Sequence, residues 1–246
     1  MKEKPILMSG PMVRAILAGT KTQTRRPVKA MLPQPETNCH PQHKQRHPAP
    51  YFDAYCGQRK TETNPRGMSD EWCWWQVDDR QCLPLLRCPF GQPGDRLWVR
   101  ESFMPIPPHK VGSEMWDIVY GADAALVACK APETYRPMLY NYERWSPSIH
   151  MPRWACRLVL EIVNVRVERL QEISEADCWA EGLEEMDGHF GNAELCAAAK
   201  RHGEMIESAR PMYSLLWDSI YAAKGQGWEA NPWVWVVEFK RVEVPS

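Results

Sequence analysis

The sequence predicts an α+β protein built around a mostly antiparallel, barrel-like β-sheet with flanking helices. Three observations support this fold class. The strand patterns lie outside the helical ones, the helical patterns are clustered, and no βαβ alternation occurs. A chain of 246 residues suits one large domain or two small ones. We expect a single domain over residues 1–246 that carries a long insertion at 27–93.

The composition is that of an ordinary globular protein, with 44% hydrophobic and 25% charged residues. Lys and Arg number 30 against 31 Asp and Glu, which gives a net charge of −1. A protein that coats nucleic acid through its overall field would be basic, so any such contact requires a local patch. No apolar run approaches the ~20 residues of a membrane span, and we expect a cytoplasmic protein without membrane contact.

The first elements are a short strand and a helix. The apolar run Lys4–Met8 predicts a strand, and Ser9-Gly10-Pro11 begins a helix with Pro near the first turn. Gly19 stands where a left-handed glycine ends a helix. A polar stretch rich in hydrogen-bond donors follows at residues 21–26.

The segment 27–93 is predicted to be a long irregular insertion. Periodicity disappears there, and ten prolines fall within it, at positions 27, 33, 35, 41, 48, 50, 65, 84, 89 and 93. Proline fixes the backbone and removes an N–H donor, so a segment this rich in proline favours irregular chain.

Regular structure resumes after the turn at Gly94-Asp95. Strands are predicted at Arg96–Glu101, at Asp117–Tyr120 and along Arg157–Leu170. The alternation in Arg157–Leu170 changes phase at Ile162–Val163, which predicts a β-bulge.

Helices and a last strand occupy the C-terminal part. Ser174 followed by acidic residues predicts an N-capped helix that ends at Gly182. Further helices are predicted at Asn192–Ser208 and Pro211–Ala223, and the alternating run Trp233–Val244 predicts the final strand.

The densest cluster of reactive side chains is in the stretch after the first helix: Lys21, Thr22, Thr24, Arg25 and Arg26. One interpretation is a solvated basic loop. The other is an anion or nucleotide site, because paired guanidinium groups suit phosphate and a Thr beside a Lys can act as a nucleophile with its base. Cooperation of Lys21 with Thr24 requires that the chain between them is not fully extended.

These residues resemble the ASCH-domain family of the PUA-like superfamily, in particular its longer members from phages and prophages. The similar pieces are the end of the first helix with Gly19, the stretch 21–26, Gly94-Asp95, the helix around Ala180-Glu181-Gly182, and the last strand at 235–239. The resemblance implies a PUA-like β-barrel. The insertion 27–93 and the extra block 102–150 depart from the small members of the family.

The resemblance also implies an activity. Some small members hydrolyse N4-acetylcytidine to cytidine and acetate with a Lys, a Thr and a Glu. By resemblance, the corresponding residues of this sequence are Lys21, Thr24 and Glu181. Lys21 would take the proton of Thr24, Thr24 would attack the acetyl carbon, and Glu181 would hold or protonate the departing amine. Arg25 and Arg26 would lower the pKa of Lys21 and help to bind substrate. In the alternative interpretation Lys21 pairs with Glu181 and Thr24 only bonds backbone.

A second cluster lies just before the central strand, at residues 145–157. Arg153 and Trp154 are its best candidates for substrate binding, because an aromatic ring can stack a base and an Arg can hold a phosphate. Tyr120 is a further candidate. The alternative is a rigid loop with its tryptophan packed in the core.

No cofactor is predicted, although the insertion holds residues that could bind a structural zinc ion: Cys39, His40, His43, His47, Cys56, Cys73, Cys82 and Cys88. No C-x₂-C pair occurs among them. The leading hypothesis is an amidohydrolase for N4-acetylcytidine or a related acylated nucleoside. The alternatives are a non-catalytic module that binds RNA or a nucleotide, and a phage factor that binds a host protein through the insertion.

Overall fold

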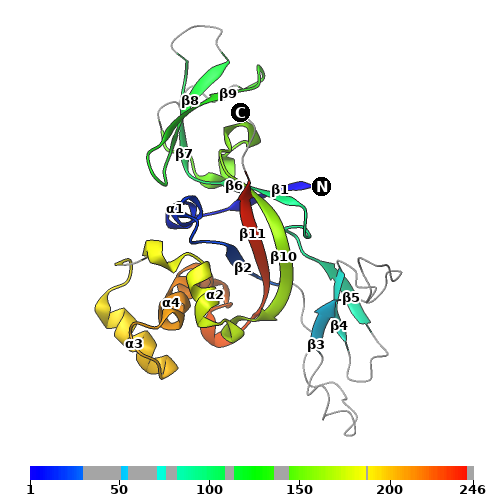
Figure 1. The fold of residues 1–246 in the computed structure, drawn as a ribbon, viewed down its shortest axis with the longest axis vertical. Helices are drawn as coiled ribbons and strands as arrows, with labels where there is room; N and C mark the ends of the chain where they lie inside the picture. Colours follow the sequence, from blue (N-terminus) through cyan, green and yellow to red (C-terminus); the bar gives the residue numbers. More distant parts are fainter. Residues whose placement is uncertain are drawn as a thin grey trace.

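The computed structural model describes residues 1–29, 51–54, 71–75, 82–108, 114–135, 144–186 and 188–242. The predicted α+β class is confirmed: the described strands form one five-stranded and two three-stranded sheets, with helices beside them. The paired strands β10 (Val159–Arg169) and β11 (Trp233–Val242) curve through the centre of the molecule (Figure 1).

The main sheet has the order β1-β6-β10-β11-β2. Its edges are β1 (Glu3–Leu7) and β2 (Gln23–Pro27), and β6 (Arg96–Arg100) lies between β1 and β10. Only the β1–β6 pair is parallel. The predicted closed barrel is not found among the described strands, because β1 pairs only with β6 and β2 only with β11. The helix α1 (Gly10–Ala18) connects these two edges, and its apolar face packs into the core between them.

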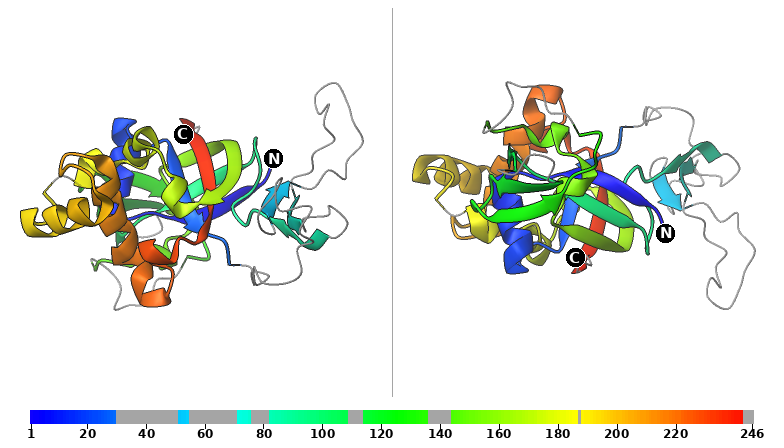
Figure 2. Two further views of the ribbon diagram at one scale, coloured as in Figure 1. Left: turned by 90° about the horizontal axis from the view of Figure 1, so that it is seen from below. Right: turned by 90° about the horizontal axis from the view of Figure 1, so that it is seen from above.

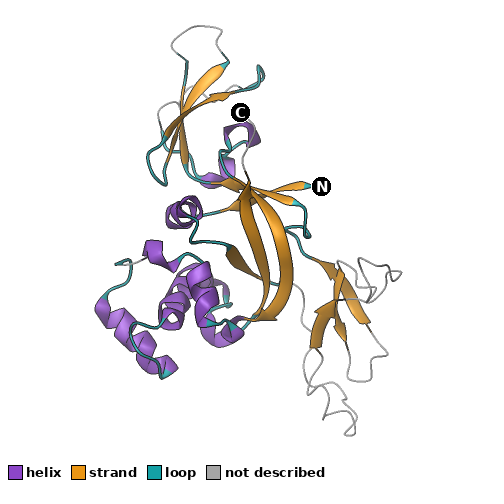
Figure 3. Cartoon of the chain, viewed as in Figure 1, coloured by secondary structure: helices purple, strands orange, loops and turns teal. Residues whose placement is uncertain are grey.

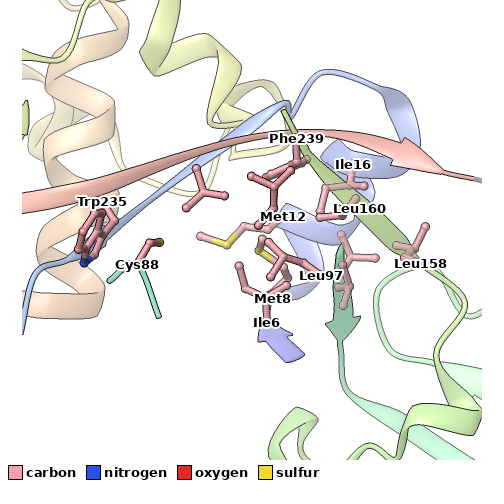
Figure 4. Close-up of a cluster of buried hydrophobic side chains, with 14 of the residues drawn as sticks. Ile6, Met8, Met12, Ile16, Cys88, Leu97, Leu158, Leu160, Trp235 and Phe239 are labelled. Carbon is pink, nitrogen blue, oxygen red and sulfur yellow. The ribbon is translucent and has the colours of Figure 1, made fainter. Parts of the chain in front are cut away.

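Apolar clusters cover both faces of this sheet. On one face the predicted row Trp235, Val237 and Phe239 packs with side chains from α1, β1, β6 and β10 (Figure 4). Val234 and Val236 point to the other face and pack against α4 (Ala209–Tyr221). The alternation of β11 therefore assigns each of its residues to one of two cores.

The predicted bulge in β10 is confirmed. The pairing of β10 with β11 shifts register between Ile162 and Asn164. Ile162 is buried whereas Val163 is 52% exposed, so the extra residue of the bulge is directed to solvent.

The helices begin and end close to the predicted positions. Gly19 ends α1 with φ of +83°, and the Ser174 hydroxyl caps α2 (Glu175–Ala180) by accepting from the Asp177 N–H at 3.1 Å. The predicted end of the next helix at Ser208 is wrong. Helix α3 (Asn192–His202) stops earlier because Gly203 takes a left-handed conformation. Figure 3 shows α2, α3 and α4 gathered on one side of the main sheet.

Part of the segment predicted to be irregular forms a sheet. Strands β3 (Tyr51–Ala54), β4 (Glu71–Trp75) and β5 (Cys82–Arg87) pair antiparallel in that order. Aromatic residue types favour strands, and Pro84 lies in the edge strand β5, where a missing donor is tolerated. Figure 2 shows this sheet at the opposite end of the molecule from α3.

The third sheet occupies the block between β6 and β10. It contains β7 (Phe103–Ile106), β8 (Met115–Tyr120) and β9 (Leu126–Lys130), of which only β8 was predicted, at Asp117–Tyr120. Its buried residues pack against the short helix η3 (Arg153–Ala155). Within the described ranges, no helix has the length and apolar character needed to traverse a bilayer.

Candidate active site

Lys21 is positioned by a tight turn at the end of α1. The N–H groups of Thr20 and Lys21 both donate to the carbonyl of Ala15, at 3.0 and 3.1 Å. The next residue, Thr22, donates its N–H to the carbonyl of Ala180 at 2.9 Å. The end of α1 is thereby bound to the end of α2, two segments that are far apart in the sequence.

This arrangement buries an ion pair. The Lys21 Nζ donates to the Glu181 Oε2 and to the Glu181 carbonyl, each at 2.8 Å. The Lys21 side chain has no exposed surface and that of Glu181 is 4% exposed. Lys21 and Glu181 therefore meet, and they do so as the salt bridge that the alternative, non-catalytic interpretation describes.

The pKa of Lys21 lies below its usual value of 10.5. Burial is the main cause, since it disfavours the charged amine. Glu181 opposes this effect, and the guanidinium groups of Arg26 and Arg25 reinforce it. A buried amine between a carboxylate and two cations is the environment in which a lysine can become a base.

Gly182 allows the two segments to approach. Its φ is +85°, a conformation that favours glycine. A Cβ at this position would lie 2.6 Å from the Ala15 Cβ and 3.0 Å from the Lys21 Cβ. The Ala-Glu-Gly sequence at the end of α2 thus has a steric reason, because its glycine makes room for Lys21.

Arg25 is the centre of a buried network of carboxylates. Its Nε donates to the Glu168 Oε1 at 2.9 Å, and its Nη2 also approaches that oxygen. Further ion pairs join its Nη2 to Asp177 at 3.2 Å and its Nη1 to Glu181 at 3.3 Å. Arg166 contacts Glu168 and Asp177 from the outer side. These carboxylates engage Arg25, which was predicted to bind substrate, and leave it no exposed side-chain surface.

Thr24 points away from this network. It lies opposite Val237 in β11, whereas Arg25 lies opposite Val236. Because directly opposed residues share a face of the sheet, Thr24 faces the core that contains Val237. Its residue is fully buried, and its Oγ1 has no hydrogen-bond partner among the described residues. A hydroxyl in that state costs stability, of order 1–3 kcal/mol.

Arg26 lies at the meeting point of three cavities. Its guanidinium donates to the carbonyls of Arg25 and Leu7, at 3.1 and 3.0 Å, and to the thioether of Met8. It donates to no carboxylate in the described part of the chain. Two larger cavities of about 690 and 390 Å³ and a small one of about 10 Å³ share Arg26 and Tyr221 as lining residues.

The small cavity lies beside Glu181 and Arg25. Side chains of α4, among them Tyr213 and Tyr221, form its other walls. Its volume is about that of a single water molecule. Neither Lys21 nor Thr24 is among its described lining residues, so Glu181 is the member of the predicted triad that faces this space.

The second predicted cluster lies elsewhere. The Tyr120 hydroxyl is buried and donates to the Ala155 carbonyl at 2.8 Å, while Arg153 pairs with Glu3 at 3.0 Å. The Trp154 ring packs edge-on against Tyr135. In the described structure, Tyr120, Arg153 and Trp154 line none of the three cavities and contact none of Lys21, Thr24 and Glu181.

A metal centre is not found in the part of the chain that is described: no three His, Cys, Asp or Glu side chains are grouped to hold an ion. Most of the residues considered as zinc ligands lie outside the described residues, among them Cys39, His40, His43, His47 and Cys56. Most of the insertion 27–93 also lies outside the described residues. This is the segment that would bind a host protein in the phage-factor alternative. Cys88 is described as a buried free thiol.

Two partners of Arg25 were missed by the sequence analysis. Glu168 and Asp177 both ion-pair with it, and Asp177 also accepts from the Gln23 amide at 2.9 Å. Asp177 was interpreted only as a first-turn acid of α2. The register of β2 against β11 was the missing information, since it decides which cation faces these acids.

No protein-family model, curated protein or solved structure matches the chain. The resemblance and the activity it implies therefore remain predictions. The structure shows the contact of Lys21 with Glu181 and places Thr24 on the other face of the sheet.

Proposed function

We propose that the protein is an amidohydrolase that removes the acetyl group from N4-acetylcytidine or a related acylated cytosine, on a PUA-like scaffold. One observation carries the proposal. The buried amine of Lys21, whose pKa is lowered, is held on the Glu181 carboxylate at 2.8 Å.

The proposed reaction uses Lys21, Thr24 and Glu181 in turn. Thr24 faces the opposite core, so the proposal requires substrate binding to bring its Oγ1 to Lys21. Neutral Lys21 then takes the proton of that oxygen, which forms a bond to the acetyl carbon. The bond from that carbon to N4 then breaks, and N4 receives the proton that Lys21 took from Thr24, either directly or through the Glu181 carboxylate. Water hydrolyses the resulting ester, which releases acetate and restores Thr24.

The substrate must enter beside α4. The small cavity at Glu181 holds about one water molecule, and the two larger cavities share Arg26 and Tyr221 with it as lining residues. We expect the acetylated edge of the base to approach from these larger cavities and to displace the half-buried Tyr221. Closure by side chains of this kind excludes water from the reacting groups.

A second candidate is a non-catalytic nucleotide-binding module. The observation in its favour is that the Lys21 Nζ already donates to two acceptors, and that Thr24 lines none of the described cavities. A lysine held in this way stabilises the junction of α1 with α2 without any chemistry. The two candidates differ in whether acetate is released.

The pH dependence of the reaction gives a direct prediction. The rate of acetate release should rise with pH and level off below 10.5, because the neutral amine of Lys21 is the base and its pKa is lowered. Lys21→Arg keeps the positive charge but is never deprotonated at these pH values. We expect it to reduce turnover on the order of 10²–10⁴-fold.

The measurement is the loss of N4-acetylcytidine absorbance over time, with far-ultraviolet circular dichroism as the control for folding. Glu181→Gln should also reduce turnover, because it removes the partner of Lys21. A rate that is independent of pH, or turnover by Lys21→Arg at the wild-type level, would overturn the assignment of Lys21 as the base. Absence of turnover with retained binding of cytidine would favour the module.

A further inference from the structure

Two larger cavities adjoin each other beside the candidate site. Cavities of about 690 and 390 Å³ share Arg26, Tyr221 and Lys224 as lining residues. We call the two cavities together the basic groove. Each cavity taken alone falls in the range of small-molecule and cofactor sites, which is roughly 300–1,000 Å³.

The groove is positively charged although the whole protein is not. Four cationic side chains line it: Arg26, Lys29, Arg87 and Lys224. None of its described lining residues is acidic. The chain carries a net charge of −1, so this concentration of positive charge is local and attracts an anion to one place.

Flat side chains lie among these cations. Phe90, Tyr221 and Trp235 line the larger cavity. The Lys224 Nζ lies 5.3 Å from the centre of the Tyr221 ring. Alternation of aromatic rings with Lys and Arg is the pattern that binds a base through its face and a phosphate through its charge.

The groove leads to the candidate site. Arg26 and Tyr221 line both larger cavities and also the small one, whose wall includes Glu181. A base that rests on Tyr221 would therefore have its exocyclic edge near Glu181 and its sugar-phosphate in the groove. A free nucleoside would carry no phosphate to place among the cationic side chains.

We propose that the basic groove binds the phosphate of a cytidine nucleotide, so that the protein takes a phosphate-bearing substrate in preference to a free nucleoside. This inference rests on the proposed function for the placement of the base, and on the charge of the groove for the phosphate. Arg and Lys side chains suit the oxygens of a phosphate, and aromatic walls suit the base that a nucleotide carries with it.

Isothermal titration of cytidine monophosphate and of cytidine into the full chain tests the proposal. We expect the monophosphate to bind at least about tenfold more tightly, with an affinity that falls as salt rises. Lys224→Glu and Lys29→Glu, which both change exposed side chains, should abolish the difference. Lys200→Glu, an exposed lysine of α3 outside the groove, should leave it unchanged.

Equal binding of monophosphate and nucleoside would overturn the proposal, as would an undiminished difference in Lys224→Glu and Lys29→Glu. A single-stranded cytidine hexamer distinguishes the sources of phosphate. Tighter binding of the hexamer with a steeper salt dependence assigns the groove to RNA, and equal affinity assigns it to free nucleotide. Either result supports the phosphate site.

Phosphate binding in the basic groove and acetate release at the candidate site can be tested separately. Lys21→Arg should lose acetate release but keep its preference for the monophosphate. A wild-type chain that prefers the monophosphate but releases no acetate would refute the amidohydrolase activity and would still support phosphate binding in the groove. Acetate release without any preference for phosphate would refute only the groove.

Discussion

Replacement of Arg25 by methionine should lower the free energy of unfolding by about 3–5 kcal/mol. Methionine keeps the length and the apolar part of the side chain but removes the charge. The carboxylates of Glu168, Asp177 and Glu181 would then lie together with fewer cations, and burial would prevent water from compensating them. Urea denaturation followed by circular dichroism measures this loss.

The matched control is Arg153→Met, which makes the same change at an exposed ion pair with Glu3. The side chains of both partners are more than one-third exposed, at 41% and 35%. Removal of this pair should therefore cost less than about 1 kcal/mol. Equal effects of the two substitutions would contradict a structural role for Arg25.

Gly182→Ala should destabilise the protein by about 2–5 kcal/mol. A left-handed backbone costs a residue with a Cβ about 1–2 kcal/mol, and overpacking adds roughly 1–3 kcal/mol. The new methyl group would lie 2.6 Å from the Ala15 Cβ, so α1 and α2 must separate. Because the same methyl also contacts the Lys21 Cβ, we expect the salt bridge to Glu181 to loosen and turnover to fall.

Gly203→Ala separates strain of the backbone from steric conflict. Gly203 has a φ of +65°, but a Cβ there would meet no atom within 4 Å. It should cost only the backbone part, about 1–2 kcal/mol, and should leave turnover unchanged. If thermal unfolding shows the same loss for both alanine variants, the close approach at Gly182 is not a requirement of the fold.

The elements with strong local signals could be predicted from the sequence. The helix ended by Gly19, the cap at Ser174 and the bulge after Ile162 each follow from a short pattern, and all three are present. Strands β7 and β9 were missed, since each is short and is stabilised mainly by pairing with β8.

The site was predicted only in part. Lys21 and Glu181 meet as expected, because both lie at the ends of elements with clear signals. The opposite directions of Thr24 and Arg25 depend on the register of β2 against β11, which no local pattern fixes. Arg153 and Trp154 had suitable chemistry for a ligand, but tertiary packing places them with Glu3 and Tyr135.

The hydroxyl of Thr24 connects the stability of the protein with its proposed chemistry. It is buried without a partner among the described residues, on a face of the sheet covered by apolar side chains. Thr24→Val keeps the shape of the side chain and removes the unsatisfied group, so we expect a gain of about 1 kcal/mol in stability. A group that lowers stability but is required for activity is typical of active sites.

Acetate release from N4-acetylcytidine by Thr24→Val, compared with the wild-type chain in the same assay, is therefore the most direct measurement. We predict that the wild-type chain converts the substrate, and that the valine variant is folded, at least as stable, and inactive. Conversion by Thr24→Val at the wild-type rate would show that this hydroxyl is not the nucleophile and would contradict the proposed mechanism.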